Sequence, residues 1–159
     1  MKIPTARDLM QSGVISVDPE ASLLDVHRLF AEEEISGAPV VDEQGELVGV
    51  ISASDLVRAV DAERDTARVE ANYFRDLLPY SAPDWSGGPE NFQDRLAELR
   101  VSDAMTSEVL TLAPETPAPA IARALRERHI HRVFVADGSR LLGIISAFDL
   151  LRVIETLSD

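Results

Sequence analysis

The string LVGVISASDLVR at residues 47–58 occurs a second time as LLGIISAFDLLR at residues 141–152. A glycine, a serine and an aspartate keep the same spacing in both strings. Outward from the strings the match continues, with Met10 aligned to Met105 at an offset of 95 residues. Chance similarity of two amphipathic segments would rarely match a Gly, a Ser and an Asp in register. The chain therefore contains an internal duplication.

Each copy has the same order of predicted elements. The predicted strands lie at 14–17, 38–41 and 47–52 in the first copy and at 109–112, 133–136 and 141–146 in the second. A helix is predicted after the first strand of each copy, with Ser22 and Thr116 as the N-caps. A second helix is predicted to begin within each quoted string. The order is strand, helix, strand, strand, helix, which predicts an α/β (α+β) fold.

The two copies are expected to pack against each other. A copy of about 55 residues would leave its sheet face and helix stripes poorly covered, so pairing about a pseudo-twofold axis is the natural way to bury them. The predicted boundaries are 5–61 and 101–156, separated by an insertion at 62–100. The insertion is predicted to be helical with a Pro/Gly-rich loop, and it holds five of the eight aromatic residues. It is expected to pack, either as a cover for core or dimer surface or as a lid or partner-docking element.

Composition excludes several classes of protein. The 159 residues carry 15 Lys and Arg against 28 Asp and Glu, a formal charge of −13 that disfavours binding to nucleic acid or anionic lipid. With no cysteine, the chain has no disulfide, thiol nucleophile or thiolate metal site. No apolar run approaches the roughly 18 residues that a membrane span needs. We therefore expect a soluble cytoplasmic protein.

The serine and aspartate of each string have two interpretations. Ser52 with Asp55, and Ser146 with Asp149, have the spacing of a helix capping box, with Asp in place of the usual Glu or Gln. Such a cap contributes about 1 kcal/mol. On this interpretation alone the motif is structural.

Two features favour a ligand site as well. Gly49 and Gly143 lie within predicted strands, where a glycine is best explained by the close approach of another backbone or of a ligand. A helix start offers free N–H groups to an anion, and a carboxylate beside it is suited to accept two ribose hydroxyls. Serine near a phosphate and aspartate on the sugar would suit a nucleotide.

With these motifs the chain resembles a tandem pair of cystathionine-β-synthase (CBS) domains, a Bateman module. The family motif, Gly-apolar-x-Ser/Thr-x-x-Asp, matches both strings, and the resemblance covers both copies but not the insertion. It implies that each copy folds as β-α-β-β-α and that adenosine-containing ligands bind in clefts between the copies. It implies ribose contacts for the two aspartates and phosphate or sugar contacts for the two serines. The ligand-approaching positions that it implies are Ser52, Asp55, Ser146, Asp149, Ser16 and Thr111.

The segment RHIHRVFV at 128–135 is similar to one that supplies a His-Arg pair to nucleotide phosphates in the γ subunit of AMP-activated protein kinase. The resemblance implies that His131 and Arg132 contact phosphate, and both side chains can donate to it. In the alternative interpretation, His129 and His131 are ordinary strand-edge residues and Arg132 pairs with a surface acid.

The two clefts are not expected to be equal. The resemblance implies that each cleft combines the aspartate of one copy with groups from the other copy. On that basis the cleft of Asp55 is expected to receive Arg132 and to be the better site, whereas the cleft of Asp149 would face Ser16 and Ser36. Both motifs are followed three residues later by an arginine, at positions 58 and 152. We expect these arginines to be exposed salt-bridge partners of the aspartates, which contribute little to stability.

These features predict a regulatory module without enzymatic activity that binds AMP, ADP or ATP, and Mg²⁺ could enter with the nucleotide. As a stand-alone CBS-domain protein it would act on another protein or on its own assembly, and a homodimer is expected. The alternative is an interaction module that acts through its dimer surface with no nucleotide bound. No HExxH, GxSxG or P-loop lysine is present in the sequence, so catalysis is not expected. No metal site is predicted.

Overall fold

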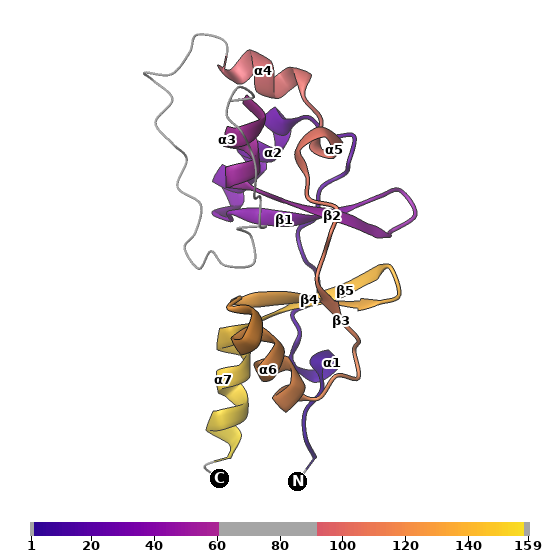
Figure 1. The fold of residues 1–159 in the computed structure, drawn as a ribbon, viewed down its shortest axis with the longest axis vertical. Helices are drawn as coiled ribbons and strands as arrows, with labels where there is room; N and C mark the ends of the chain where they lie inside the picture. Colours follow the sequence, from indigo (N-terminus) through magenta and orange to yellow (C-terminus); the bar gives the residue numbers. More distant parts are fainter. Residues whose placement is uncertain (1, 61–91, 158–159) are drawn as a thin grey trace. The chain divides into compact units, whose positions relative to one another are not determined.

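The computed structural model describes residues 2–60 and 92–157, which fall into two compact units (Figure 1). The first-repeat unit contains residues 15–44, 48–60 and 92–109. The second-repeat unit contains residues 2–14, 45–47 and 110–157. Strands and helices are mixed in both units, as the sequence predicts.

In the first-repeat unit, helices pack on a two-stranded sheet. The elements are α2 (Leu23–Glu33), β1 (Gly37–Val41), β2 (Leu47–Ser52), α3 (Ala53–Val60), α4 (Phe92–Glu98) and α5 (Val101–Ala104). All four helices contribute buried side chains to one core, among them Phe30, Leu56, Leu96 and Val101, which pack with Val40 of β1. Residues 62–91 of the predicted insertion lie outside the described residues, but its end forms α4 and belongs to this core.

The second-repeat unit contains a three-stranded sheet. Its elements are α1 (Ala6–Leu9), β3 (Thr111–Leu112), α6 (Ala118–Arg128), β4 (Arg132–Asp137), β5 (Arg140–Ser146) and α7 (Ala147–Thr156). The strand order is β3-β4-β5, with β3 parallel and β5 antiparallel to β4. Val133 and Val135 of β4 pack with Ile121 and Leu125 of α6 in the core.

The first predicted strand of each copy is shorter than expected. In the first copy only Val17 pairs, in a single parallel bridge to Val40. The Val17 N–H donates to the Pro39 carbonyl, and the Val41 N–H donates to the Val17 carbonyl. The next bond of a parallel ladder would need an N–H on Pro39, which proline lacks, so the ladder stops there. The second copy has Phe134 at that position, and there Thr111 and Leu112 form a strand.

The predicted caps of the two first helices differ in outcome. The Ser22 hydroxyl accepts a hydrogen bond from the Asp25 N–H, so the predicted N-cap of α2 is confirmed. The prediction that Thr116 caps α6 is wrong, because Pro117 occupies the N-cap. Thr116 lies one residue before the cap, and its carbonyl accepts from the Ala6 N–H. A residue that precedes proline is pushed toward extended backbone, which moves the helix start later.

The first segment of each copy packs on the hairpin of the other copy. Gln11 exchanges two backbone hydrogen bonds with Ile144 of β5, at 2.8 and 3.0 Å. Thr106 exchanges two with Val50 of β2, both at 2.9 Å. The compact units are therefore assembled from both halves of the chain, and the repeat pattern gave no sign of this exchange.

The same contacts explain the two strand glycines. A Cβ built on Gly143 would lie 2.7 Å from the Gln11 carbonyl oxygen and 2.8 Å from the Met10 sulfur. A Cβ built on Gly49 would lie 2.9 Å from the Thr106 carbonyl oxygen and 2.7 Å from the sulfur of Met105, which aligns with Met10. The predicted close approach of another backbone is confirmed, and the chain itself supplies it. The glycines therefore provide no separate evidence for a ligand.

Among the helices built from residues 2–60 and 92–157, none combines the length and the apolarity that crossing a bilayer requires.

Candidate functional site

The motif of the first repeat forms a buried cap at the start of α3. The backbone N–H and the hydroxyl of Ser52 both donate to Oδ2 of Asp55, at 2.8 and 3.1 Å. Both side chains are buried, and Asp55 keeps 3% of its surface exposed. These contacts confirm the structural interpretation of this serine-aspartate pair.

The motif of the second repeat is a complete capping box at the start of α7. The N–H and hydroxyl of Ser146 donate to Oδ2 of Asp149 at 2.7 and 3.1 Å. The Asp149 N–H donates back to the Ser146 hydroxyl at 3.3 Å. In both repeats the cap uses Oδ2, so the other carboxylate oxygen, Oδ1, is the one that can serve a second purpose.

The Oδ1 atoms of the two carboxylates have different neighbours. Oδ1 of Asp55 accepts from Nη2 of Arg58 at 2.7 Å. Oδ1 of Asp149 accepts from the Gln11 side-chain amide at 3.1 Å, while Nη2 of Arg152 lies 3.6 Å away. That Nη2 also donates to the Leu9 carbonyl at 2.8 Å.

Both predicted salt bridges are therefore present, but both carboxylates are buried, and in the first pair the arginine is partly buried as well. The side chain of Asp55 is 3% exposed and that of Arg58 is 27% exposed. The small contribution to folding stability that is expected of exposed ion pairs does not apply to the pair of Asp55 and Arg58, because the carboxylate of this pair has lost most of its water.

Burial raises the pKa of the Asp55 carboxyl above its ordinary value of 3.8. Loss of water disfavours the ionised form, and this effect exceeds the opposing effects of the Ser52 hydrogen bonds and of the Arg58 guanidinium. Keeping Asp55 ionised inside the folded first-repeat unit therefore costs free energy.

The two histidines of the segment 128–135 have different environments. His129 is the C-cap of α6, with a left-handed φ of 54°, so the interpretation of His129 as a strand-edge residue is wrong. The equivalent residue of the first repeat, Glu34, has the same role: it is the C-cap of α2, with a φ of 55°. His131 lies directly before β4, and its carbonyl accepts from the N–H of Ala147, the first residue of α7. Its backbone therefore contacts the helix start that carries the second motif.

Arg132 is placed beside the same motif by the sheet register. It is paired directly with Ser146 across β4 and β5. Directly opposed residues of an antiparallel pair project from the same face with Cβ atoms about 4.5–5.5 Å apart. Val133, the next residue, faces the core with α6, so Arg132 projects from the opposite face. Inside the second-repeat unit the fold thus brings together His131, Arg132, Ser146 and Asp149.

The remaining predicted positions are distributed over both units. Asp55 and Ser52 lie in the first-repeat unit, where the Ser36 carbonyl accepts from the N–H of Ala53, the first residue of α3. Ser16 is exposed beside the Val17 bridge of the same unit. Thr111 lies in β3 of the second-repeat unit, paired with Phe134.

Sequence reasoning missed Gln11, whose amide contacts Asp149 across 138 positions of the chain. A signal was present, because the offset of 95 residues aligns Gln11 with Thr106, an amide against a short hydroxyl. The repeat match alone does not show that this position contacts the motif, since the contact depends on the exchange of segments.

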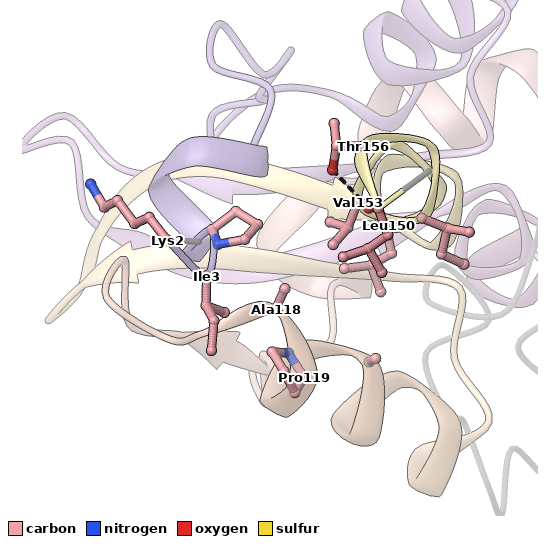
Figure 2. A pocket seen from close by; sticks show the side chains of 11 residues that line it. Lys2, Ile3, Ala118, Pro119, Leu150, Val153 and Thr156 are labelled. Carbon is pink, nitrogen blue, oxygen red and sulfur yellow. Dashed lines mark hydrogen bonds between the residues drawn. The ribbon is translucent and has the colours of Figure 1, made fainter. Parts of the chain in front are cut away.

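A separate apolar groove of about 530 Å³ lies in the second-repeat unit (Figure 2). Residues of the N-terminal segment, of α6 and of α7 line it. Figure 2 shows Ile3 near Ala118 and Pro119 of α6, with Leu150 and Val153 on α7. Ser146 and Asp149 are not among its described lining residues, so the groove is distinct from the motif.

Known proteins resemble this chain over most of its length. It is 29% identical to protein MJ1426 of Methanocaldococcus jannaschii over 156 residues, which cover 96% of this chain and 92% of that protein. It is 30% identical over 140 residues to the chloroplastic CBS domain-containing protein CBSX2 of Arabidopsis thaliana, covering 86% of this chain but 56% of CBSX2. The chain thus spans little more than half the length of that plant relative.

Solved structures and a family model agree with these relatives. A crystal structure of CBSX2 in complex with AMP superposes with a TM-score of 0.67 at 24% identity, covering 98% of this chain and 99% of that one. The model of the CBS domain matches residues 6–62 and 101–156. Together with the duplicated motif and the mixed fold of both units, these matches show that the chain belongs to the CBS domain family as a tandem pair of CBS domains.

Proposed function

We propose that this protein is a regulatory module that binds an adenosine-containing ligand and has no catalytic activity of its own. The observation that carries the proposal is the placement of Arg132 opposite Ser146, the residue that caps α7 together with Asp149. A cationic residue, the start of a ten-residue helix and a carboxylate then come together in the second-repeat unit. The complex of the relative CBSX2 with AMP supports the choice of ligand class.

Each group has a proposed role in holding a nucleotide. Arg132 makes a charge-assisted contact with a phosphate oxygen, and His131 is the second phosphate contact. Asp149 accepts a hydrogen bond from a ribose hydroxyl through Oδ1, since its Oδ2 is used by the cap. The Ser146 N–H and hydroxyl are committed to that cap, so Ser146 acts mainly by positioning Asp149.

The first-repeat motif offers a less favourable ribose contact. Its carboxylate oxygen Oδ1 is held by Arg58 at 2.7 Å, and a sugar hydroxyl would have to compete with that guanidinium. We therefore propose Asp149 as the main ribose-binding carboxylate and Asp55, with Ser52, as the weaker one. This reverses the ranking that the sequence led us to expect.

The ligand would act by shifting a population between two arrangements. A ligand changes such an equilibrium only by its differential affinity for the two states. The output is proposed to be a change in an effector protein or in the assembly of the protein itself. Nothing in this scheme requires a metal ion, although Mg²⁺ can accompany ATP or ADP.

Ligand-induced stabilisation of the full chain tests the proposal. AMP, ADP, ATP, S-adenosylmethionine and NAD would be compared in thermal unfolding, with inosine monophosphate as a control for the adenine. A ligand at 100 times its dissociation constant stabilises the folded state by about 2.7 kcal/mol, which is readily measured as a rise in Tm. If none of the adenosine compounds raises the Tm at millimolar concentration, the proposal is wrong.

A second candidate function, an interaction module that acts through a dimer surface, has an observation in its favour. Phe148, Leu151 and Ile154 of α7 are 68%, 49% and 61% exposed, and their spacing of three residues places them along one side of the helix. The stripe adjoins the apolar groove, which Ile154 also lines. A second copy of the chain is the proposed occupant, and it would bury these side chains whether or not a nucleotide is bound.

A further inference from the structure

Gln11 and Thr106 occupy equivalent backbone positions in the two units. Each exchanges a pair of backbone hydrogen bonds with a strand residue next to a motif glycine, Gln11 with Ile144 and Thr106 with Val50. Each carbonyl oxygen lies under 3 Å from the place where that glycine would carry a Cβ. Because the two backbones are fixed in the same way, the side chains are the principal difference between these positions.

The difference in length changes what reaches the motif carboxylate. The Gln11 amide extends three bonds beyond its Cβ and donates to Oδ1 of Asp149 at 3.1 Å. The Thr106 hydroxyl sits directly on its Cβ, and Oδ1 of Asp55 accepts from Arg58 at 2.7 Å instead. In the second motif, Nη2 of Arg152 stays 3.6 Å from Oδ1 of Asp149 and donates a hydrogen bond to the Leu9 carbonyl instead.

We propose that Gln11 is a positioning residue that makes Asp149 the stronger of the two ribose-binding carboxylates. This inference rests on the function proposed above. The amide is neutral, so it fixes the orientation of Oδ1 without cancelling its charge. By occupying that side of the carboxylate, it also keeps Arg152 from closing to a tight ion pair.

A close ion pair would weaken the carboxylate as a ribose acceptor. Oδ1 has two lone pairs, and a guanidinium at 2.7 Å takes one of them with a full positive charge. A neutral amide at 3.1 Å leaves the negative charge of Asp149 available to a hydroxyl. The Gln11 side-chain oxygen is a second acceptor beside the carboxylate, which suits a vicinal diol.

A reciprocal exchange of the two residues tests the inference. Gln11→Thr and Thr106→Gln would be made in the full chain, and binding of AMP and of 2′-deoxy-AMP would be measured by calorimetry. Gln11→Thr is expected to weaken AMP about tenfold and to reduce the preference for AMP over 2′-deoxy-AMP. Thr106→Gln is expected to leave the stronger site unchanged and to strengthen the weaker one.

A rescue experiment separates positioning from a direct or merely structural role. If Gln11 acts by keeping Arg152 off Asp149, then Arg152→Met added to Gln11→Thr should recover most of the lost affinity. The Tm of each variant without ligand reports whether it folds, and the ratio of the two affinities is insensitive to a general loss of stability.

The outcomes are distinguishable from failure of the proposed function. If the wild-type protein binds none of the adenosine ligands, the proposed function fails and this inference fails with it. If the wild-type protein binds AMP and Gln11→Thr keeps both its affinity and its preference over 2′-deoxy-AMP, Gln11 has no such role and the proposed function stands. Loss of affinity without recovery in the double variant would overturn the positioning role assigned here.

Discussion

Arg132 and Ser146 lie directly opposite each other on β4 and β5. A permanently charged residue is thereby placed opposite the residue that caps α7, and both residues belong to the second-repeat unit. The first repeat has Gly37 where the second has Arg132, so this cation is a property of one repeat. The two motifs share a cap but differ in the charge around it.

Replacing Arg132 by alanine is expected to weaken AMP binding much more than adenosine binding. A hydrogen bond to a charged group contributes about 1.5–3 kcal/mol, which corresponds to roughly a tenfold to a hundredfold loss of affinity. Calorimetric titration with both ligands measures the difference, and Arg128→Ala on the last turn of α6 is a matched control. Equal losses for AMP and adenosine would contradict a phosphate contact.

Asp149→Asn is expected to reduce AMP affinity while the unfolding free energy changes by less than about 1 kcal/mol. Asparagine also serves at helix starts, so its side-chain oxygen can keep the hydrogen bonds from Ser146. The negative charge that attracts the ribose hydroxyls is lost. Asp55→Asn is expected to have the smaller effect on affinity, and the opposite order in calorimetry would restore the ranking that the sequence favoured.

The local elements were predictable because short-range chemistry determines them. Ser22 has a hydroxyl that accepts from the third residue of α2, and the serine-aspartate spacing of both motifs produces their caps. The errors arose where a neighbouring residue or a distant segment decides the outcome. Proline displaced the start of α6, and a left-handed C-cap took His129 out of the strand.

The exchange of segments explains why the site was only partly predicted. The duplication shows which residues are equivalent, but not which hairpin the first segment of each copy pairs with. Gln11 could not be assigned to Asp149 without that information. The pairing of Arg132 with Ser146 was also out of reach, because counting from the hairpin turn at 138–139 places Arg132 opposite Ile145, and the register shift between Val135 and Ala136 moves it by one residue.

The raised pKa of Asp55 predicts a specific dependence of stability on pH. The folded chain holds the proton of this carboxyl to a higher pH than the unfolded chain does, so this contribution to stability is fully present below the ordinary carboxyl pKa of 3.8. It is lost as pH rises through the raised folded value. Asn at position 55 does not titrate, so the unfolding free energy of Asp55→Asn relative to wild type should increase from acid toward neutral pH.

Urea denaturation of both proteins between about pH 3.5 and 7 measures this difference, and taking the difference removes the titration of the other carboxyls. Asp149→Asn is the matched control for a motif carboxyl with a less buried guanidinium partner. A difference that decreases with pH would mean that Arg58 dominates the pKa of Asp55 over burial.

Gly143→Ala and Gly49→Ala are expected to destabilise the protein by about 1–3 kcal/mol each, as overpacked sites do. The new methyl group at residue 143 would lie 2.7 Å from the Gln11 carbonyl oxygen, which two backbone hydrogen bonds hold in place. Met10→Ala should relieve the Gly143 variant only in part, because it removes the sulfur contact and leaves the carbonyl. Full recovery of the unfolding free energy in the double variant would show that the side chain, not the backbone, requires the glycine.

Leu151→Glu is expected to favour the monomer if a second copy covers the exposed stripe of α7. Its side chain is 49% exposed and lies between Phe148 and Ile154, so a carboxylate there would be buried without a partner in the dimer. Sedimentation equilibrium measures the association constant, and Glu155→Gln on the same helix is a control that leaves the stripe apolar. AMP titration of the monomeric variant then separates the two candidate functions. A nucleotide sensor with its binding groups inside one repeat unit keeps its affinity for AMP as a monomer. If AMP binding instead depends on dimer formation, the ligand lies at the surface between two molecules of the protein.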